Sequence, residues 1–551
     1  MKVYEAVADT LVSAGMRQVF AVMGHGNIDL LGHLTSKRHV PAVHARHEQG
    51  AVAMADGYAR VSGGLGVAMV TQGPGLSNTA TALLTAAKVH SRVLLVCADT
   101  PGDDPDNSQY MDQVAFSRAT AGAFEHVASP ERLGSALAAA FGHLRLGRGP
   151  VVLNIPTDVL SAELSAPLRG IDTSVVQSPP LNPSPAAVER AATLLGASAQ
   201  PVILAGRGAV DANAGAALGA LSDTLNAPFL TSLLGGGLNS GHPLSGGTAG
   251  PFGKGLGSAL LAEADCVYAA GVSLSPWTTS GGRVLAAKNV IQVDSHPEQI
   301  AIRYPVTVPV IGDAALTTEL ITDALRARGA SGGWDESLRE RIAAYPGREY
   351  PPFDDRDGQI DPRRILLALN DALPRSRAVV TDTGSFVHFT LQLIDSFDAR
   401  RLAPTNNFGA VGQALGTGIG ACFAIPGEPV TVICGDGGFM MSLNEFHTAV
   451  RYRLPLQVIV MNDQAYTAER RSLVARGWPD TEARHPSPDL AALAEAFGAR
   501  GRRITTLGDL EQLPDFLKCE DGPILIDVAI NGDVVNPVGA HIARGLARSG
   551  T

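Results

Sequence analysis

Short runs of nearly all-apolar residues, many of them β-branched, alternate with longer amphipathic stretches along most of the chain. Such runs are typical of parallel strands covered on both faces, and the stretches between them fit amphipathic helices. The pattern therefore predicts α/β domains built on doubly wound parallel sheets. The predicted strands lie at residues 18–22, 66–71, 92–97, 150–155, 201–205, 265–270, 290–293, 378–381, 430–434, 457–461 and 523–528.

Two polar stretches rich in Pro and Gly interrupt this alternation, at residues 165–185 and 329–362. Stretches of this composition are typical of linkers between domains. They predict three α/β domains, at residues 1–165, 186–328 and 360–551. A chain of 551 residues is long enough for about three domains of ordinary size.

Composition and charge exclude several classes of function. The 43 basic and 53 acidic residues leave a net charge of −10, so no overall basic field is available to attract nucleic acid. No apolar run reaches the roughly 18 residues of a membrane span, and no apolar stretch follows a basic start as in a signal peptide. The five cysteines are widely spaced and form no C-x-x-C pair, which argues against disulfides and zinc. We expect a cytoplasmic protein without nucleic-acid or membrane partners.

The strongest chemical signal follows an apolar run in the last third of the chain. Residues 429–434 lead directly into Gly435-Asp436-Gly437-Gly438, after which a helical pattern begins. A strand that ends in glycines and opens a helix gathers bare backbone N–H groups around one point, where a diphosphate can bind. An acidic side chain there needs a bridging cation, so Asp436 is a candidate ligand for Mg²⁺ or Ca²⁺. The local pattern alone also fits an ordinary acidic turn.

A second apolar run, at residues 457–461, ends at Asn462 and Asp463. Ligands gather where the carboxyl ends of neighbouring parallel strands lie side by side. Asp463 is therefore a candidate for the second metal ligand.

These two strand ends together resemble the signature of the thiamine diphosphate-dependent enzymes. Asp463 stands where that family usually has the second Asn of a pair, but either side chain offers a hard oxygen ligand. The resemblance implies thiamine diphosphate and Mg²⁺, or Ca²⁺ in its place, as cofactors. It assigns the metal to Asp436, Asp463 and the carbonyl of Ala465, and the rest of the diphosphate site to Gly437, Gly438 and Tyr466.

Two segments in the first third resemble the acetolactate synthase-like branch of this family, at residues 44–60 and 72–78. The resemblance implies that Glu48 hydrogen-bonds the pyrimidine ring of the cofactor. It would favour the imino tautomer, whose exocyclic nitrogen removes the thiazolium proton. Gly73 and Asn78 would lie in a cofactor-binding turn. Outside this motif, Glu48 would be an ordinary helix-start residue or a partner in a surface salt bridge.

Two turns in the last third extend the resemblance. Residues 407–412 resemble the loop that bends the cofactor, with Val411 as the apolar buttress and the carbonyl of Gly409 holding the amino group. Valine is smaller than the Met, Leu or Ile usual at this position. Gly384 and Ser385 align with the first phosphate-contacting turn.

The middle domain resembles one that carries FAD or ADP in some relatives and is empty in others. A glycine turn follows an apolar run at residues 205–209. Such a turn is weak evidence alone, so neither nucleotide is expected here.

Five polar residues lie where the resemblance places substrate contacts. The turn at His25 resembles that of ring-opening cyclohexanedione hydrolases, the segment at Gln113 resembles benzaldehyde lyase, and that at Glu469 resembles pyruvate decarboxylase. His47 and His388 lie beside predicted cofactor-binding residues. For each of the five, the alternative is a supporting role behind the site or on a helix surface. We keep His25, Gln113 and Glu469 as catalytic candidates together with Glu48.

The resemblance implies a carboligase or lyase of the acetolactate synthase-like type. It would act on a 2-oxo acid or acyloin through an enamine intermediate. The alternatives within the family are a non-ligating 2-oxo acid decarboxylase and a hydrolase of cyclic 1,2-diones. No His-His pair occurs near residues 105–115, which disfavours a simple pyruvate decarboxylase.

Two other classes compete with this interpretation. An NAD-dependent oxidoreductase is disfavoured because no G-x-G-x-x-G follows the first strand. A regulatory protein that has lost catalysis is disfavoured by the intact Glu48, Asp436 and Asp463. The family also implies that each site is shared between subunits. We expect at least a homodimer, and a homotetramer as is common in this family.

Overall fold

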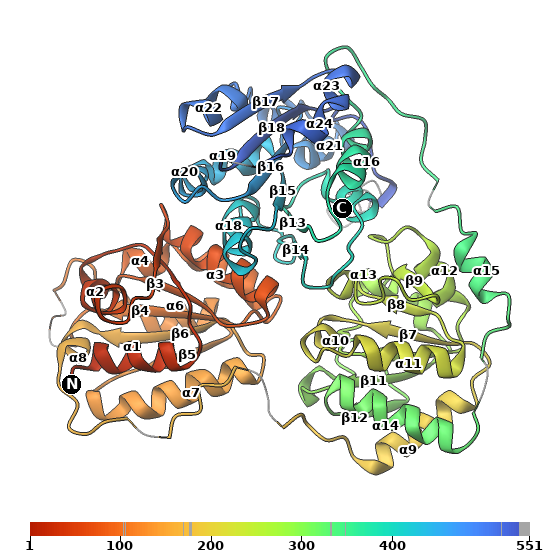
Figure 1. The fold of residues 1–551 in the computed structure, drawn as a ribbon, viewed down its shortest axis with the longest axis horizontal. Coiled ribbons are helices and arrows are strands. Elements are labelled where there is room, and N and C mark those ends of the chain that lie inside the picture. The colour runs from red at the N-terminus through yellow and green to blue at the C-terminus, as the bar shows by residue number, and fades with distance from the viewer. Residues whose placement is uncertain are drawn as a thin grey trace.

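The computed structural model contains three α/β units, each built on a six-stranded parallel sheet flanked by helices (Figure 1). It describes residues 1–538 except 103, 105, 169, 176–178, 331–332, 348 and 520. All strand pairs within the three sheets are parallel. The predicted fold class is therefore confirmed.

The N-terminal sheet has the strand order β2-β1-β3-β4-β6-β5. Its strands are β1 (Val19–Ala21), β2 (Ala42–His44), β3 (Gly66–Val70), β4 (Val93–Asp99), β5 (Ala123–His126) and β6 (Val151–Pro156). Its helices are α1 (Val3–Ser13), α2 (Ile28–Lys37), α3 (Glu48–Ser62), α4 (Pro74–Ser77), α5 (Ala80–Ala87), α6 (Gln113–Thr120), α7 (Leu133–Arg145) and α8 (Thr157–Ser161), with 3₁₀ turns η1 (His25–Asn27) and η2 (Pro130–Arg132).

The central sheet has the order β12-β11-β10-β7-β8-β9. Its strands are β7 (Pro201–Ala205), β8 (Phe229–Thr231), β9 (Ser245–Thr248), β10 (Cys266–Ala270), β11 (Asn289–Asp294) and β12 (Val308–Ile311). Its helices are α9 (Pro185–Gly196), α10 (Arg207–Asp211), α11 (Gly215–Leu225), α12 (Leu256–Glu263), α13 (Pro276–Thr279), α14 (Ala314–Ala327) and α15 (Leu338–Ala343), with η3 (Leu233–Gly235), η4 (Arg283–Leu285) and η5 (Pro297–Gln299). Helix α15 lies within the predicted second linker, because Trp334 and Leu338 are buried in the central core.

The C-terminal sheet has the order β14-β13-β15-β16-β18-β17. Its strands are β13 (Ala378–Thr381), β14 (Leu402–Pro404), β15 (Val430–Gly435), β16 (Leu456–Asn462), β17 (Arg500–Ile504) and β18 (Ile524–Ala529). Its helices are α16 (Pro362–Ala372), α17 (Val387–Leu393), α18 (Ala414–Ala424), α19 (Asp436–Met441), α20 (Leu443–Arg451), α21 (Thr467–Ala475), α22 (Leu490–Ala496), α23 (Leu507–Glu511) and α24 (Leu513–Phe516), with η6 (Thr481–Ala483).

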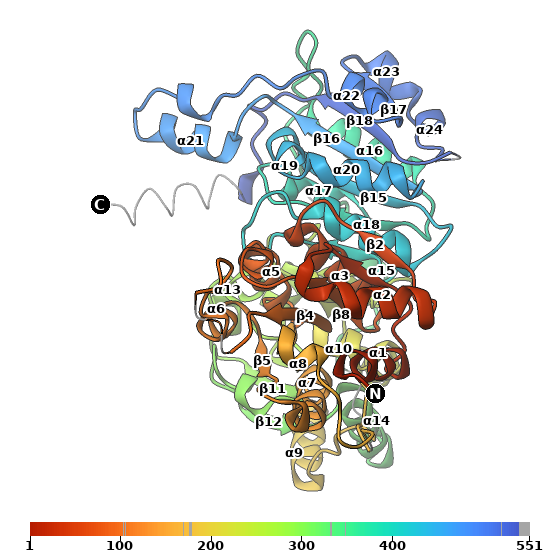
Figure 2. The ribbon, with the colours of Figure 1, turned by 90° about the vertical axis from the view of Figure 1, so that its left-hand side faces the viewer.

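Helices α3 and α18 join the N-terminal and C-terminal units and lie side by side (Figures 1 and 2). Glycines bring their backbones together: a Cβ on Gly57 would lie 1.9 Å from the carbonyl oxygen of Thr417, and one on Gly420 would lie 1.8 Å from that of Met54. One hydrophobic cluster runs through both units around this contact. Burial of apolar surface on both sheets therefore fixes the orientation of the two units.

The central unit contacts both neighbours through one acidic side chain. Asp211 lies 3.9 Å from Arg92 of the N-terminal unit and 3.7 Å from Arg400 of the C-terminal unit. Partly buried charges of opposite sign are screened less than exposed ones. Asp211 therefore links the central unit to both neighbours.

Among the described residues, no helix combines the length and the apolar character that crossing a bilayer requires.

Candidate functional site

The predicted metal ligands Asp436 and Asp463 lie at the carboxyl ends of neighbouring strands. Strands β15 and β16 pair with Gly435 opposite Met461, so the turns that follow them are adjacent. Asp436 opens α19 directly after β15, and the residue is 1% exposed. Asp463 follows β16 and accepts a hydrogen bond of 2.5 Å from the hydroxyl of Thr467. The structure thus brings together the two side chains that the sequence placed at one sheet edge.

Glycines keep this edge free of side chains. A Cβ on Gly437 would lie 2.5 Å from the ring of Tyr466, and one on Gly438 would lie 2.5 Å from a carboxylate oxygen of Asp382. Neither position has room for a larger residue. The backbone at the start of α19 is therefore open to a close approach by an anion, as a diphosphate cradle requires.

The two carboxylates are strongly desolvated. Burial raises the pKa of Asp436, although the hydroxyl of Ser487 donates to it at 2.7 Å. Burial, with the nearby charge of Asp436, raises the pKa of Asp463 to about 6. Two adjacent buried carboxylates favour a divalent cation, which compensates both charges.

This donor set fits Mg²⁺ or Ca²⁺. The described residues contain no group of three or more His, Cys, Asp or Glu side chains arranged for a metal. Two carboxylates, a backbone carbonyl such as that of Ala465, and phosphate oxygens match the coordination that Mg²⁺ prefers in phosphate sites.

We expect Mg²⁺ to stabilise the apoprotein strongly at about pH 8 and hardly at about pH 5. The pKa of Asp463 is raised to about 6 and that of Asp436 is also raised, so both carboxyls bind protons more readily than free aspartates as the pH falls, and protonation competes with the cation. For the same reason, the free energy of unfolding of the metal-free protein should fall as the pH rises from about 4 to about 6, because the native state binds these protons more tightly. Thermal unfolding with and without Mg²⁺ at both pH values tests this. An equal shift in Tm at both would contradict it.

Asp382 connects two of the predicted cofactor-binding turns. Its buried carboxylate follows β13, accepts the backbone N–H of Gly412 at 2.8 Å and the hydroxyl of Thr405 at 3.3 Å. Burial raises its pKa to about 6. Gly409 and Gly412 have φ of +79° and +81°, in the left-handed region that favours glycine. This loop holds Val411 against the start of α19, since Val411 would touch a Cβ on its Gly438.

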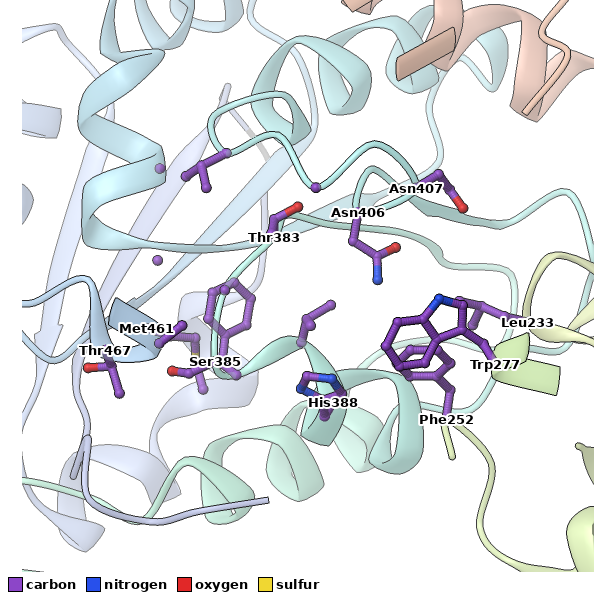
Figure 3. Close-up of a pocket in the computed structure, with 18 of the residues that line it drawn as sticks. Leu233, Phe252, Trp277, Thr383, Ser385, His388, Asn406, Asn407, Met461 and Thr467 are labelled. Carbon is purple, nitrogen blue, oxygen red and sulfur yellow. The ribbon is translucent and has the colours of Figure 1, made fainter. Parts of the chain in front are cut away.

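A cavity of about 800 Å³ lies between the C-terminal and central units (Figure 3). Its C-terminal wall contains every cofactor-binding residue predicted in that unit, together with His388 and Glu469. These predicted residues are Gly384, Ser385, Gly409, Val411, Asp436, Gly437, Gly438, Asp463, Ala465 and Tyr466. The structure therefore brings them together around one space.

The predicted residues of the N-terminal unit do not line this cavity. Glu48 begins α3 and accepts a hydrogen bond of 3.0 Å from the side-chain amide of Asn78. Gln113 is 1% exposed, and its side chain accepts the N–H of Gly73 at 2.6 Å. In this structure Gln113 positions the Gly73 turn. His25 is exposed on η1.

Another carboxylate holds the segment before Glu48. The buried Glu445 of α20 accepts the backbone N–H groups of Arg46 and His47, both at 3.0 Å. Burial raises the pKa of Glu445. His47 caps α3 by accepting the N–H of Gln49. His47 thus has a structural partner at the helix start.

Several contacts of the site were not identified from sequence. Those of Asp382, Glu445 and Ser487 join residues far apart in the chain, although Asp382 directly follows a predicted strand. Phe252 and Trp277, from central-unit loops, also line the cavity. No local sequence pattern marks those two aromatic residues.

Comparison with known proteins agrees with this arrangement. Residues 1–121 match the thiamine pyrophosphate enzyme N-terminal TPP binding domain, 188–321 the central domain, and 382–528 the C-terminal TPP binding domain. The chain is 30% identical to sulfoacetaldehyde acetyltransferase of Castellaniella defragrans, over 92% of this chain and 88% of that protein. It is 28% identical to acetolactate synthase isozyme 3 large subunit of Escherichia coli, over 96% and 94%. It is 31% identical to "Probable 2-ketoarginine decarboxylase" of Pseudomonas aeruginosa, over 92% and 90%. The chain therefore belongs to the thiamine pyrophosphate enzyme family.

Proposed function

We propose that this protein is a thiamine diphosphate- and Mg²⁺-dependent carboligase or lyase that acts on a 2-oxo acid or acyloin. The observation that carries the proposal is the cavity that unites two buried carboxylates, a glycine turn and the Val411 loop at one sheet edge. Relatives that include an acetyltransferase and an acetolactate synthase support transfer of a two-carbon unit as the reaction type.

Residues of the C-terminal unit would bind and orient the cofactor. Bound thiamine diphosphate would supply a nucleophilic carbon and an electron sink for the substrate carbonyl. Asp436, Asp463 and the Ala465 carbonyl would hold Mg²⁺, and the N–H groups after Gly437 would face the diphosphate. Val411 would support the rings. The cavity walls would exclude water from the reacting atoms.

Glu48 would hold a proton at the pyrimidine nitrogen. Its position at the start of α3, next to the Asn78 amide, leaves its carboxylate with only one described side-chain partner. Because Glu48 does not line the cavity within its own chain, we propose that it serves the cavity of a partner subunit in a homodimer. A homotetramer is the larger assembly we expect.

Two inactive variants should regain activity when their subunits are mixed. Glu48→Gln lacks the proton-holding side chain, and Asp436→Ala lacks the metal ligand. If each site combines two chains, a mixed dimer has one intact site, and random mixing should restore about a quarter of wild-type activity. Assays before and after mixing, with subunit exchange followed by native mass spectrometry, test this. Exchange without recovery would contradict a shared site.

A decarboxylase that does not ligate is the second candidate. Glu469 lines the cavity and is exposed. It could therefore protonate the reacting carbon, so that an aldehyde is released and no bond forms to a second carbonyl compound. The relative named as a 2-ketoarginine decarboxylase supports this alternative. The sequence around His25 supports the other alternative, a hydrolase of cyclic 1,2-diones.

The state of the cysteines supports a proposal for the cellular location. All five cysteines are free, and four of them are buried. A reducing compartment suits free thiols, and we propose the cytoplasm. We propose that the central unit binds neither FAD nor ADP.

Titration of the apoprotein with thiamine diphosphate and Mg²⁺, followed by circular dichroism on adding pyruvate, tests the proposal. Saturable binding with a new dichroic band is the expected result. Product analysis then separates ligation from release of the aldehyde. No binding of thiamine diphosphate at any Mg²⁺ concentration would overturn the proposed function.

A further inference from the structure

Leu233, Phe252, Trp277, His388 and Asn406 line one part of the cavity, which we call the chamber (Figure 3). Phe252 lies between two other rings. Its ring centroid is 5.9 Å from that of Trp277, and it stacks on His388 at 5.6 Å with an angle of 12°. The chamber therefore has an aromatic wall from the central unit that faces the C-terminal unit.

Trp277 is firmly held but poorly covered. Its helix α13 begins with Ser275, whose hydroxyl accepts the N–H of Thr278, and a Cβ on Gly250 would lie 2.7 Å from the Trp277 carbonyl oxygen. The Trp277 side chain is nevertheless 50% exposed. A rigid backbone that presents a large uncovered indole to a cavity is typical of a surface that binds an apolar, flat group.

Two buried polar atoms of the cavity wall have no hydrogen-bond partner among the described residues. They are the hydroxyl oxygen of Thr383 and Oδ1 of Asn406. A buried polar atom without a partner is costly, so these atoms favour a ligand that carries hydrogen-bonding groups. Burial lowers the pKa of His388, so its ring is neutral and can donate or accept one bond.

Cations also line the cavity. Lys88, Arg303 and Arg471 are part of its wall, and Lys88 and Arg303 are exposed. The guanidinium of Arg303 donates to the carbonyl of Ser273 at 3.2 Å. Cations beside an apolar wall favour a negatively charged substrate over a neutral aldehyde, through attraction that weakens with salt.

We propose that the chamber binds the side chain of an aryl-substituted 2-oxo acid. The ring would lie against Trp277 and Phe252, and polar atoms of the substrate would pair with Asn406 and His388. The methyl group of pyruvate would leave this wall uncovered. This inference rests on the proposed function and names the substrate class of the same site.

Trp277→Ala should separate the two substrate classes. We expect kcat/KM for phenylpyruvate to fall roughly tenfold, from the lost aromatic contact, while the value for pyruvate changes less than about twofold. Trp277→Phe should retain most of the phenylpyruvate activity. Phe353→Ala is a matched control, since this aromatic residue is 44% exposed and does not line the cavity. It should leave both substrates unchanged.

Substrate binding can also be measured in an inactive variant. In the Glu48→Gln protein loaded with thiamine diphosphate and Mg²⁺, calorimetry should show tighter binding of phenylpyruvate than of pyruvate, and added Trp277→Ala should abolish that difference. Equal losses for both acids, or a preference for pyruvate, would overturn the inference and leave the proposed function intact. Flavin absorbance that copurifies with the wild type and disappears in Trp277→Ala would also overturn it. If instead the proposed function is wrong, thiamine diphosphate does not bind, and this result is distinguishable from the others.

Discussion

Glu48→Gln should lower kcat by about 100-fold to 10,000-fold while thiamine diphosphate and Mg²⁺ still bind. Gln keeps the size of the side chain and its contact with the Asn78 amide, which lies 3.0 Å from the Glu48 carboxylate. It cannot hold an exchangeable acidic proton at the pyrimidine nitrogen. Steady-state rates combined with calorimetric titration of the cofactor separate the loss of chemistry from a loss of binding.

A matched change elsewhere controls for the removal of a negative charge. Glu131 lies on η2 of the same unit, is exposed and does not line the cavity. Glu131→Gln should therefore behave as wild type. If Glu48→Gln also turns over at the wild-type rate, the assignment of the proton to Glu48 is wrong, whatever substrate is used.

Asp436→Ala should weaken Mg²⁺-dependent binding of thiamine diphosphate by at least about 100-fold. Asp436 is one of the two carboxylates proposed as metal ligands, and it is buried where the glycine turn opens α19. The metal-free variant should still fold, since removal of a buried carboxylate also removes its desolvation cost. Cofactor titrations monitored by tryptophan fluorescence, at several Mg²⁺ concentrations, measure the effect.

Asp357→Ala provides the comparison for this second variant. Asp357 is exposed, lies in the segment before α16 and does not line the cavity. Its replacement should leave the dependence on Mg²⁺ unchanged. An Asp436→Ala protein that binds the cofactor with wild-type affinity at every Mg²⁺ concentration would remove Asp436 from the metal site.

The strands that sequence patterns predicted lie in the interiors of the three sheets, whereas most of those they missed lie at the edges. Strands β2 and β5, β9 and β12, and β14 and β17 end the three sheets. An edge strand is covered less completely than an interior one, so its sequence lacks the unbroken apolar run. β17 shows this directly, because its sequence Arg-Gly-Arg-Arg-Ile is largely exposed. The three sheets were therefore predicted from their interior strands alone.

The candidate site was predictable where its residues directly follow strands. Asp436 and Asp463 belong to turns after β15 and β16, so the pairing of those strands brings them together. The aromatic wall was not predictable in this way. Phe252 and Trp277 reach the cavity only because the central unit packs against the C-terminal unit, and that packing depends on contacts between residues far apart in the chain. The partners of Gln113 were not predictable either, since a motif match does not reveal that its side chain bonds the backbone of Gly73 and Ala98 and the side chain of Asn154.

The aromatic wall and the strand-end turns belong to different α/β units of one polypeptide. Substitutions in the loops that carry Phe252 and Trp277 should leave the β15 and β16 turns intact, because those turns are part of another sheet. If the aromatic wall selects the substrate, mutation can change substrate preference there without changing the proposed reactive centre. The same separation makes the two central-unit loops a natural place for a randomised library in directed evolution, because variation there spares the groups on which every turnover depends.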